Sequence, residues 1–213
     1  MKKFTKLLLV AIFAVLLAFA AAACGLGTGG TGDEKETGGG GPKAYKTAGT
    51  YKVGTDMDAG EYLLISDYQE DTTTMTAYYQ VTLTANASVT STDFLYNNNF
   101  YFRTYVKVED GQYFNFTRSK LYKIEDCSAI DKNAASWRPG QYKIGADIDS
   151  GEYKFTVLEA YASIGGSVVV TKIPDVRPIS TDFVSIKIVD STHYVDLAEG
   201  QYVELARCSM AKA

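Results

Sequence analysis

Three short segments of the chain return, in the same order, further along the sequence. They are residues 49–62 (GTYKVGTDMDAGEY), which return as 140–153 (GQYKIGADIDSGEY), residues 91–94 (STDF), which return as 180–183, and residues 111–113 (GQY), which return as 200–202. The first match is offset by 91 positions and the other two by 89, so the second copy is about two residues shorter. Three ordered matches predict a duplicated module, and this repeat limits which folds are possible.

Within each copy, apolar and polar residues alternate with a period of two, which is typical of half-buried strands. The alternating segments are residues 79–84, 100–108, 113–116, 167–172 and 184–188. No part of the repeated region shows a sustained helical period. The predicted fold class is therefore all-β, with two tandem antiparallel β-sandwich repeats of the jelly-roll or immunoglobulin-like kind, because each copy must bury one apolar face.

Glycine and aspartate residues separate these segments. Gly54 and its counterpart Gly145 precede an Asp-x-Asp sequence, where glycine is favoured because it tolerates a positive φ. Residues 109–112 (EDGQ) and 198–201 (AEGQ) predict hairpin turns between two strands.

The N-terminus has the pattern of an export signal. Lys2, Lys3 and Lys6 form a basic stretch, the apolar residues 7–20 follow, and small residues lead to Cys24. The apolar run is short for a permanent transmembrane helix, so we expect the signal to be removed.

The small residues 21–23 directly before Cys24 resemble the lipobox of bacterial lipoproteins. The resemblance implies that a diacylglycerol with palmitate-type acyl chains is joined to the Cys24 thiol, which becomes the new N-terminus. Ala21 departs from the pattern, in which a larger aliphatic residue is usual. Two acyl chains provide the anchor that stable membrane attachment needs. The alternative is an ordinary secretory signal that is cut nearby and leaves a free protein.

The segment after Cys24 is rich in Gly and Thr and carries almost no large apolar residue, so it predicts a flexible tether. Removing a signal with three lysines and no acids takes the net charge from −4 to −7. Such an acidic protein is not expected to bind nucleic acid. The expected location is the extracellular face of the cell membrane, with the lipid as anchor.

These observations divide the chain into five parts. We expect a signal peptide at residues 1–23, a lipidated cysteine and tether at 24–47, a first β-module at 48–126, a linker at 127–138 and a second β-module at 139–213.

The repeated motif, as it stands in residues 51–62 and 142–153, resembles a β-module of lipoproteins and surface proteins of Gram-positive bacteria. In that family the motif reads Tyr-x-Val-Gly-x-Asp-Ile-Pro-x-Gly-x-Tyr, and a Gly-Gln-Tyr turn closes the module. Asp58 and Asp149 stand where the family usually has proline. The resemblance implies an exported all-β module that has a binding or a structural role and no enzymatic activity.

Tyrosine is abundant, with 16 residues, and several crowd the middle of the first copy. The predicted ligand-binding residues are Tyr78, Tyr79, Tyr96, Tyr101 and Tyr105. Exposed aromatic rings on a sheet can stack on sugars or form the centre of a protein interface. The alternative is that these rings belong to the core or pair across strands.

Other reactive side chains predict little chemistry. Two sets of carboxylates, one in each copy, provide oxygen atoms of the kind that calcium takes: Asp56, Asp58 and Glu61, and Asp147, Asp149 and Glu152. A complete calcium-loop pattern is missing, and the aspartates suit a turn. His193 has no recognisable catalytic partner. We therefore predict no catalytic residue, no metal and no cofactor.

Cys127 and Cys208 remain once Cys24 is lipidated, and in an exported protein they could form a disulfide. The two cysteines do not occupy equivalent repeat positions, so the sequence leaves both the bridge and two separate thiols open.

The sequence thus predicts a non-enzymatic, lipid-anchored surface protein that binds a cell-wall glycan, a peptide or another surface protein. The alternative is a structural or accessory lipoprotein of a membrane complex with no soluble ligand.

Overall fold

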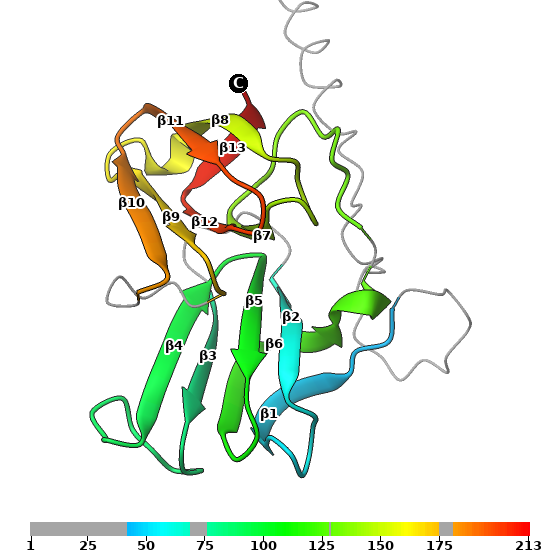
Figure 1. The fold of residues 1–213 in the computed structure, drawn as a ribbon. Coiled ribbons are helices and arrows are strands. Elements are labelled where there is room, and N and C mark those ends of the chain that lie inside the picture. The colour runs from blue at the N-terminus through cyan, green and yellow to red at the C-terminus, as the bar shows by residue number, and fades with distance from the viewer. Residues whose placement is uncertain (1–41, 69–75, 128, 175–180) are drawn as a thin grey trace, which may run out of the picture.

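The computed structural model describes residues 42–68, 76–127, 129–174 and 181–213, and in these residues the chain is all-β (Figure 1). The predicted all-β fold class is therefore confirmed. Cys24, the signal peptide and most of the tether lie outside the described residues. Among the residues described, no helix has the length and apolar character needed to cross a membrane.

The first half of the structure contains six strands that pair antiparallel. They are β1 (Lys46–Lys52), β2 (Gly60–Ser66), β3 (Ala77–Thr82), β4 (Phe94–Phe100), β5 (Arg103–Val108) and β6 (Tyr113–Lys123). They form a sheet with the order β4-β3-β6-β2-β5, and β1 also pairs with β6. A short 3-10 helix, η1 (Ile124–Asp126), follows β6.

The second half contains the remaining strands of the described chain. They are β7 (Gly140–Lys143), β8 (Gly151–Val157), β9 (Gly166–Thr171), β10 (Phe183–Val189), β11 (Thr192–Leu197), β12 (Tyr202–Ala206) and β13 (Cys208–Lys212), with the 3-10 helix η2 (Glu159–Tyr161) between β8 and β9. They form one sheet with the order β10-β9-β12-β7 and another with the order β11-β8-β13.

The strand pairings of the two halves correspond when the offsets of the repeated segments are applied. Lys52 lies opposite Tyr113 in the β1–β6 pair, and Lys143 lies opposite Tyr202 in the β7–β12 pair. The pairs β2–β5, β2–β6, β3–β4 and β3–β6 correspond in the same way to β8–β11, β8–β13, β9–β10 and β9–β12. Similar local sequence therefore produces the same antiparallel registers twice.

An arginine with positive φ marks the point where the last strand of each half changes partners. Arg118 (φ 56°) lies within β6, and Arg207 (φ 62°) lies between β12 and β13. Before Arg118, β6 pairs with β3, and after it β6 pairs with β2. Strands that cross from one sheet layer to another do so at such irregular residues.

The repeated motif supplies core residues in both halves. In the first half, Val53, Met57 and Tyr62 are buried in one cluster with residues of β3 and β6. The Tyr62 hydroxyl donates a hydrogen bond of 2.8 Å to the carbonyl of Asp58. Tyr153 makes the equivalent bond of 2.7 Å to Asp149. The motif therefore closes its own turn and anchors it in the core.

The predicted turns are confirmed. Gly54 and Gly145 have φ values of 85° and 92°, which only glycine adopts without strain. The two predicted hairpins join β5 to β6 and β11 to β12.

A third apolar cluster joins the halves. It contains Leu63, Ile65, Tyr105 and Tyr122 from the first half and Tyr202 from the second. Leu64 of β2 faces the core of the first half, whereas its neighbours Leu63 and Ile65 face the third cluster. Strand β2 is therefore buried on both faces, and β7 and β12 lie above β2 and β5 (Figure 1).

Candidate functional site

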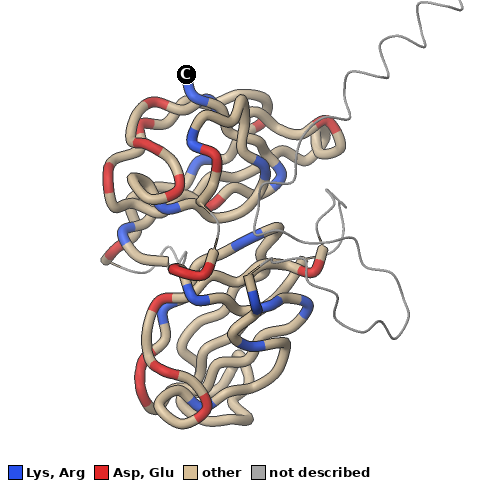
Figure 2. Tube along the Cα trace, turned by 90° about the vertical axis from the view of Figure 1, so that its right-hand side faces the viewer, with Lys and Arg blue, Asp and Glu red and all other residues tan. Residues whose placement is uncertain are grey.

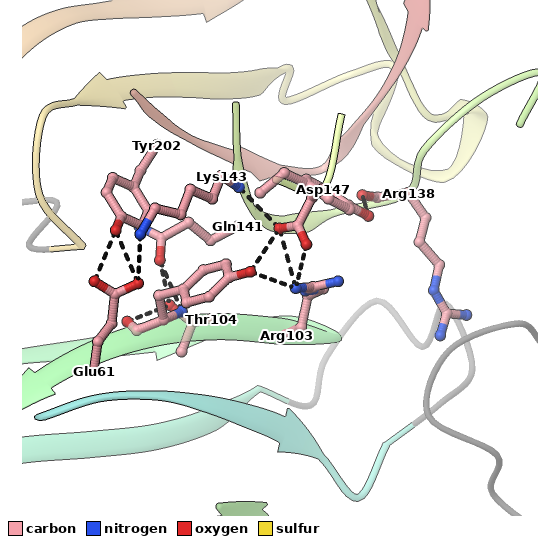
Figure 3. A network of polar contacts seen from close by, with 10 residues as sticks. Glu61, Arg103, Thr104, Arg138, Gln141, Lys143, Asp147 and Tyr202 are labelled. Carbon is pink, nitrogen blue, oxygen red and sulfur yellow. Dashed lines mark hydrogen bonds and ion pairs between the residues drawn. The ribbon is translucent and has the colours of Figure 1, made fainter. Parts of the chain in front are cut away.

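Polar side chains from both halves meet where β7 and β12 cover β2 and β5 (Figure 3). In a sheet, successive side chains point to opposite faces, so each strand presents one set of residues to its own core and another outward. The outward residues of β2 and β5 meet the outward residues of β7 and β12. This contact brings together two ion pairs and several hydrogen bonds between the halves.

Arg103 and Asp147 form the centre of the site. The Nη2 atom of Arg103 lies 3.2 Å from Oδ1 and 3.1 Å from Oδ2 of Asp147, and both side chains are almost fully buried. The Tyr105 hydroxyl donates a hydrogen bond of 2.9 Å to the same carboxylate. Burial raises the pKa of Tyr105, so its hydroxyl keeps its proton. A buried carboxylate needs such donors, because an isolated buried charge is costly.

Gln141 of β7 connects the strands through its amide. Its Oε1 accepts hydrogen bonds from the backbone N–H of Tyr105 (2.8 Å) and from Thr104 Oγ1 (3.2 Å). Its Nε2 donates to the carbonyl of Pro174 (2.9 Å). Gln141 has no exposed surface, so these bonds replace those that water would make.

Glu61 of β2 makes a second ion pair across the contact. The Lys143 Nζ atom lies 3.0 Å from Glu61 Oε1, and the Tyr202 hydroxyl lies 2.9 Å from both carboxylate oxygens. Burial, followed by the hydrogen bond to Glu61, raises the pKa of Tyr202. Lys143 also lies over the Tyr202 ring, at 5.0 Å from its centroid.

Glu204 of β12 lies at the edge of the contact. Asn98 of β4 donates a hydrogen bond of 2.8 Å from Nδ2 to Glu204 Oε2. Burial raises the pKa of Glu204 to about 7, and the bond from Asn98 offsets only part of that rise. Glu204 therefore changes its charge near neutral pH.

The network holds the two surfaces together through one buried ion pair and one partly exposed ion pair. The described residues contain no group of three or more His, Cys, Asp or Glu side chains that could hold a metal ion. Lys and Arg residues are interspersed with Asp and Glu residues along both halves, including the region between the halves (Figure 2).

The prediction that Tyr79 and Tyr105 are exposed ligand-binding residues is wrong. Tyr79 is 1% exposed and packs against Tyr96, Phe100 and Phe114 in the core of the first half. Tyr105 is 2% exposed and lies in the contact between the halves. Neither ring can stack on a ligand at the surface.

The other three predicted tyrosines do not share one face either. Tyr78 is half-buried and accepts a hydrogen bond of 3.1 Å from Asn97. Tyr96 packs against the core cluster, and its hydroxyl donates to the carbonyl of Lys107. Tyr101 is half-buried just after β4. The alternative interpretation of the tyrosines, as core and pairing residues, describes them better.

Of the two possibilities that the sequence left open for Cys127 and Cys208, the structure has the two separate thiols. Cys208 is buried in the core of the second half, whereas Cys127 packs against the third cluster. The two thiols therefore pack in different apolar clusters.

The aspartates of the motif serve the turn. Asp56 accepts a hydrogen bond of 2.8 Å from the backbone N–H of Lys52, and Asp147 accepts one of 2.9 Å from Lys143. His193 lies on β11 opposite Phe155 and is half-buried.

An exposed apolar surface occurs on β10. Val184, Ile186 and Ile188 are 42%, 49% and 65% exposed, at alternate positions of one strand. Strand β10 is the edge of its sheet, with β9 on one side and no paired strand on the other among the described residues. Ile186 lies opposite Val169, so the two side chains extend one outer face.

The corresponding strand of the first half, β4, does not have this surface. Its equivalent positions are Leu95, Asn97 and Asn99. The apolar outer face of β10 is therefore particular to the second half and is not required by the repeated fold.

The sequence did not point to Arg103 or Gln141 as site residues, and Asp147 stood out only as an acidic residue of the repeated turn. Arg103 has Thr192 as its counterpart in the second copy, and a difference between otherwise similar copies is the signal that could have drawn attention to it. No protein-family model, no curated protein and no solved structure matches this chain.

Proposed function

We propose that this protein is a non-enzymatic lipoprotein at the outer face of a bacterial membrane, and that it binds an extended peptide segment of another surface protein along β10. The observation that carries the proposal is the apolar outer face of an edge strand, formed by Val184, Ile186 and Ile188. A monomeric protein rarely exposes three adjacent large apolar side chains on an open edge, because such an edge pairs with other chains.

An open edge can bind a peptide in a specific way. The backbone N–H and C=O groups that point away from β9 can pair with an added strand, and alternate side chains of the peptide then pack on the sheet face. Ile186 and Ile188 would contact apolar side chains on that face. The backbone bonds would provide affinity, and the isoleucines would select apolar residues at every second position.

The N-terminal features support the location. The basic stretch, the apolar segment at residues 7–20 and Cys24 have the pattern of a lipoprotein signal. The Gly- and Thr-rich tether would allow the folded part to reach partners away from the membrane. A glycan ligand is less well supported than a peptide, because the two tyrosines Tyr79 and Tyr105 are buried.

The experiment compares the full-length protein with the Ile186→Lys/Ile188→Lys variant. Each protein is immobilised and used to select from a phage-displayed library of random linear peptides, and each is also incubated with purified cell-wall sacculi. We expect the unaltered protein to select peptides with alternating apolar residues and the variant to select none. Circular dichroism of both proteins checks that the β fold is retained.

Ile164→Lys is the matched control, because Ile164 is an exposed isoleucine (63%) outside β10. This control should select the same peptides as the unaltered protein. Selection of the same peptides by the Ile186→Lys/Ile188→Lys variant would contradict the proposal. Retention on sacculi without peptide selection would favour the glycan ligand, and neither kind of binding would favour a structural or accessory lipoprotein.

A further inference from the structure

The contact between the halves joins two different faces of the repeated unit. Face A is the outer surface of β2 and β5, with Glu61 and Tyr105. Face B is the outer surface of β7 and β12 with the adjoining turn, and it carries Lys143, Asp147 and Tyr202. Since both halves have the same strand pairings, each half has both faces. Within the part of the chain that the structure describes, one face A and one face B remain uncovered.

The uncovered face B belongs to β1 and β6. It carries Lys52, Asp56 and Tyr113. These residues correspond to the three residues of the second half that bind face A within the chain. Lys52 and Asp56 are exposed and Tyr113 is half-buried, whereas Asp147 and Tyr202 are buried by the first half.

The uncovered face B also has the same internal arrangement. The Lys52 N–H donates to Asp56 Oδ2 at 2.8 Å, as Lys143 does to Asp147 at 2.9 Å. The Lys52 Nζ atom lies over the Tyr113 ring at 5.9 Å from its centroid, against 5.0 Å for Lys143 over Tyr202. The side chains of the uncovered face B therefore already have the arrangement that binds face A, although no partner is bound to them.

The uncovered face A belongs to β8 and β11, at the end of the molecule away from the first half (Figure 1). It retains Glu152 and Tyr194, which correspond to Glu61 and Tyr105. Tyr194 is 53% exposed, whereas Tyr105 is 2% exposed.

We propose that the uncovered face A of one copy binds the uncovered face B of the next, so that the protein forms head-to-tail rows. Glu152 would accept hydrogen bonds from Lys52 and Tyr113 of the neighbouring copy, and the Tyr194 hydroxyl would donate to Asp56. Both partners of each of these contacts are present on the free faces. A contact between two different faces leaves one face of each kind free on every pair, so it extends to further copies.

The contact between copies is weaker than the contact within the chain. Leu63, Ile65 and Arg103 of the covered face A correspond to Lys154, Thr156 and Thr192 of the uncovered face A. The uncovered face A therefore lacks the residues that form the apolar cluster and the buried ion pair within the chain. Attachment to one membrane surface compensates, because it raises the effective concentration of one copy near another. The rows therefore form on membranes.

The first test uses full-length protein, half of it labelled with 15N, in vesicles of phosphatidylcholine. A carbodiimide joins carboxylates to amines in direct contact, and mass spectrometry identifies the joined peptides. Glu61–Lys143 within one chain is the internal standard, at 3.0 Å. We expect Glu152–Lys52 peptides that combine labelled and unlabelled chains. Recovery of the Glu61–Lys143 product without any Glu152–Lys52 product between chains would overturn the proposal.

The second test uses charge reversal and a longer amine-reactive cross-linker, with products sized on a denaturing gel. The unaltered protein should give a ladder, and Glu152→Lys or Lys52→Glu alone should give single chains. A mixture of the two variants should restore the ladder, because the unaltered pair and the exchanged pair both bring opposite charges together. Glu159→Lys, an exposed change outside both faces, should keep the ladder. A ladder from either single variant would overturn the proposal.

These outcomes are separate from those of the peptide-binding proposal, because β10 is outside both faces. They also do not depend on lipidation, since residues 7–20 or a lipid on Cys24 would each attach the full-length chain to a vesicle.

Discussion

Arg103 of β5 and Asp147, which follows β7, form a buried ion pair that joins the two halves at 3.1 Å. The pair is accompanied by donors from Tyr105 and from the backbone of Lys143, so the carboxylate has several partners. In the second half, Thr192 occupies the position that corresponds to Arg103. The ion pair therefore distinguishes the covered face from the free face of the same repeated unit.

Removing the guanidinium should destabilise the protein strongly. We expect Arg103→Met to lower the free energy of unfolding by about 3 kcal/mol or more, because Asp147 would remain buried with its charge only partly compensated. Urea unfolding followed by tryptophan fluorescence measures the change, since Trp137 lies in the core of the second half. Lys132→Met is the matched control, because Lys132 and Asp149 form an exposed pair at 3.1 Å. Its effect should stay below about 1 kcal/mol, and equal effects of the two substitutions would contradict the prediction.

Glu204 should make stability depend on pH. Its pKa is raised to about 7 in the folded protein from about 4.5, so the folded state holds a proton that the unfolded state releases. The stability from this group is complete below about pH 4.5 and is lost as the pH rises to about 7, by an amount of about 1 to 3 kcal/mol. Glu204→Gln should lose less stability than the unaltered protein between pH 5 and pH 8. Identical losses in urea unfolding at these two pH values would argue against the raised pKa.

Tyr79 should matter for stability. Tyr79→Ala removes a ring that is 1% exposed, so we expect a loss of about 3 to 5 kcal/mol from the cavity it leaves. Tyr78→Phe removes a hydroxyl from a half-buried ring and should cost about 1 kcal/mol or less. Thermal unfolding of both variants by calorimetry compares them. A small effect of Tyr79→Ala would show that this ring is not a core residue.

The two cysteines should differ in reactivity. Burial raises the pKa of the Cys208 thiol to about 11, so little thiolate forms at pH 8 and reagents have no access. Iodoacetamide should therefore modify Cys127, which is half-buried, before Cys208 in the folded protein and both equally in urea. Peptide mass spectrometry follows the modification. A peptide pair linked by a Cys127–Cys208 disulfide, obtained without reduction, would be the contrary result.

Much of the local structure could be predicted because it depends on neighbours in sequence. The alternation in residues 184–188 predicted a strand, and residues 109–112 predicted a hairpin turn, since side-chain period and turn geometry are local properties. The same alternation could not show that β2 is buried on both faces. Leu63, Leu64 and Ile65 are all apolar, and the face that meets the second half depends on residues far away in the chain.

The candidate site could not be predicted from residue type, because tyrosine is equally suited to a core, an interface and a surface. Tyr105 and Tyr194 occupy equivalent positions, yet the first is buried in the contact and the second is exposed.

By itself, the sequence determined the repeat, the strands and the turns, because the residues that specify them lie close together in the chain. The tertiary structure decided which of two equivalent faces is covered. That choice depends on side chains that meet only after folding, such as Arg103 with Asp147 and Glu61 with Lys143. Equivalent motif residues are therefore part of the contact between the halves in one copy and exposed in the other.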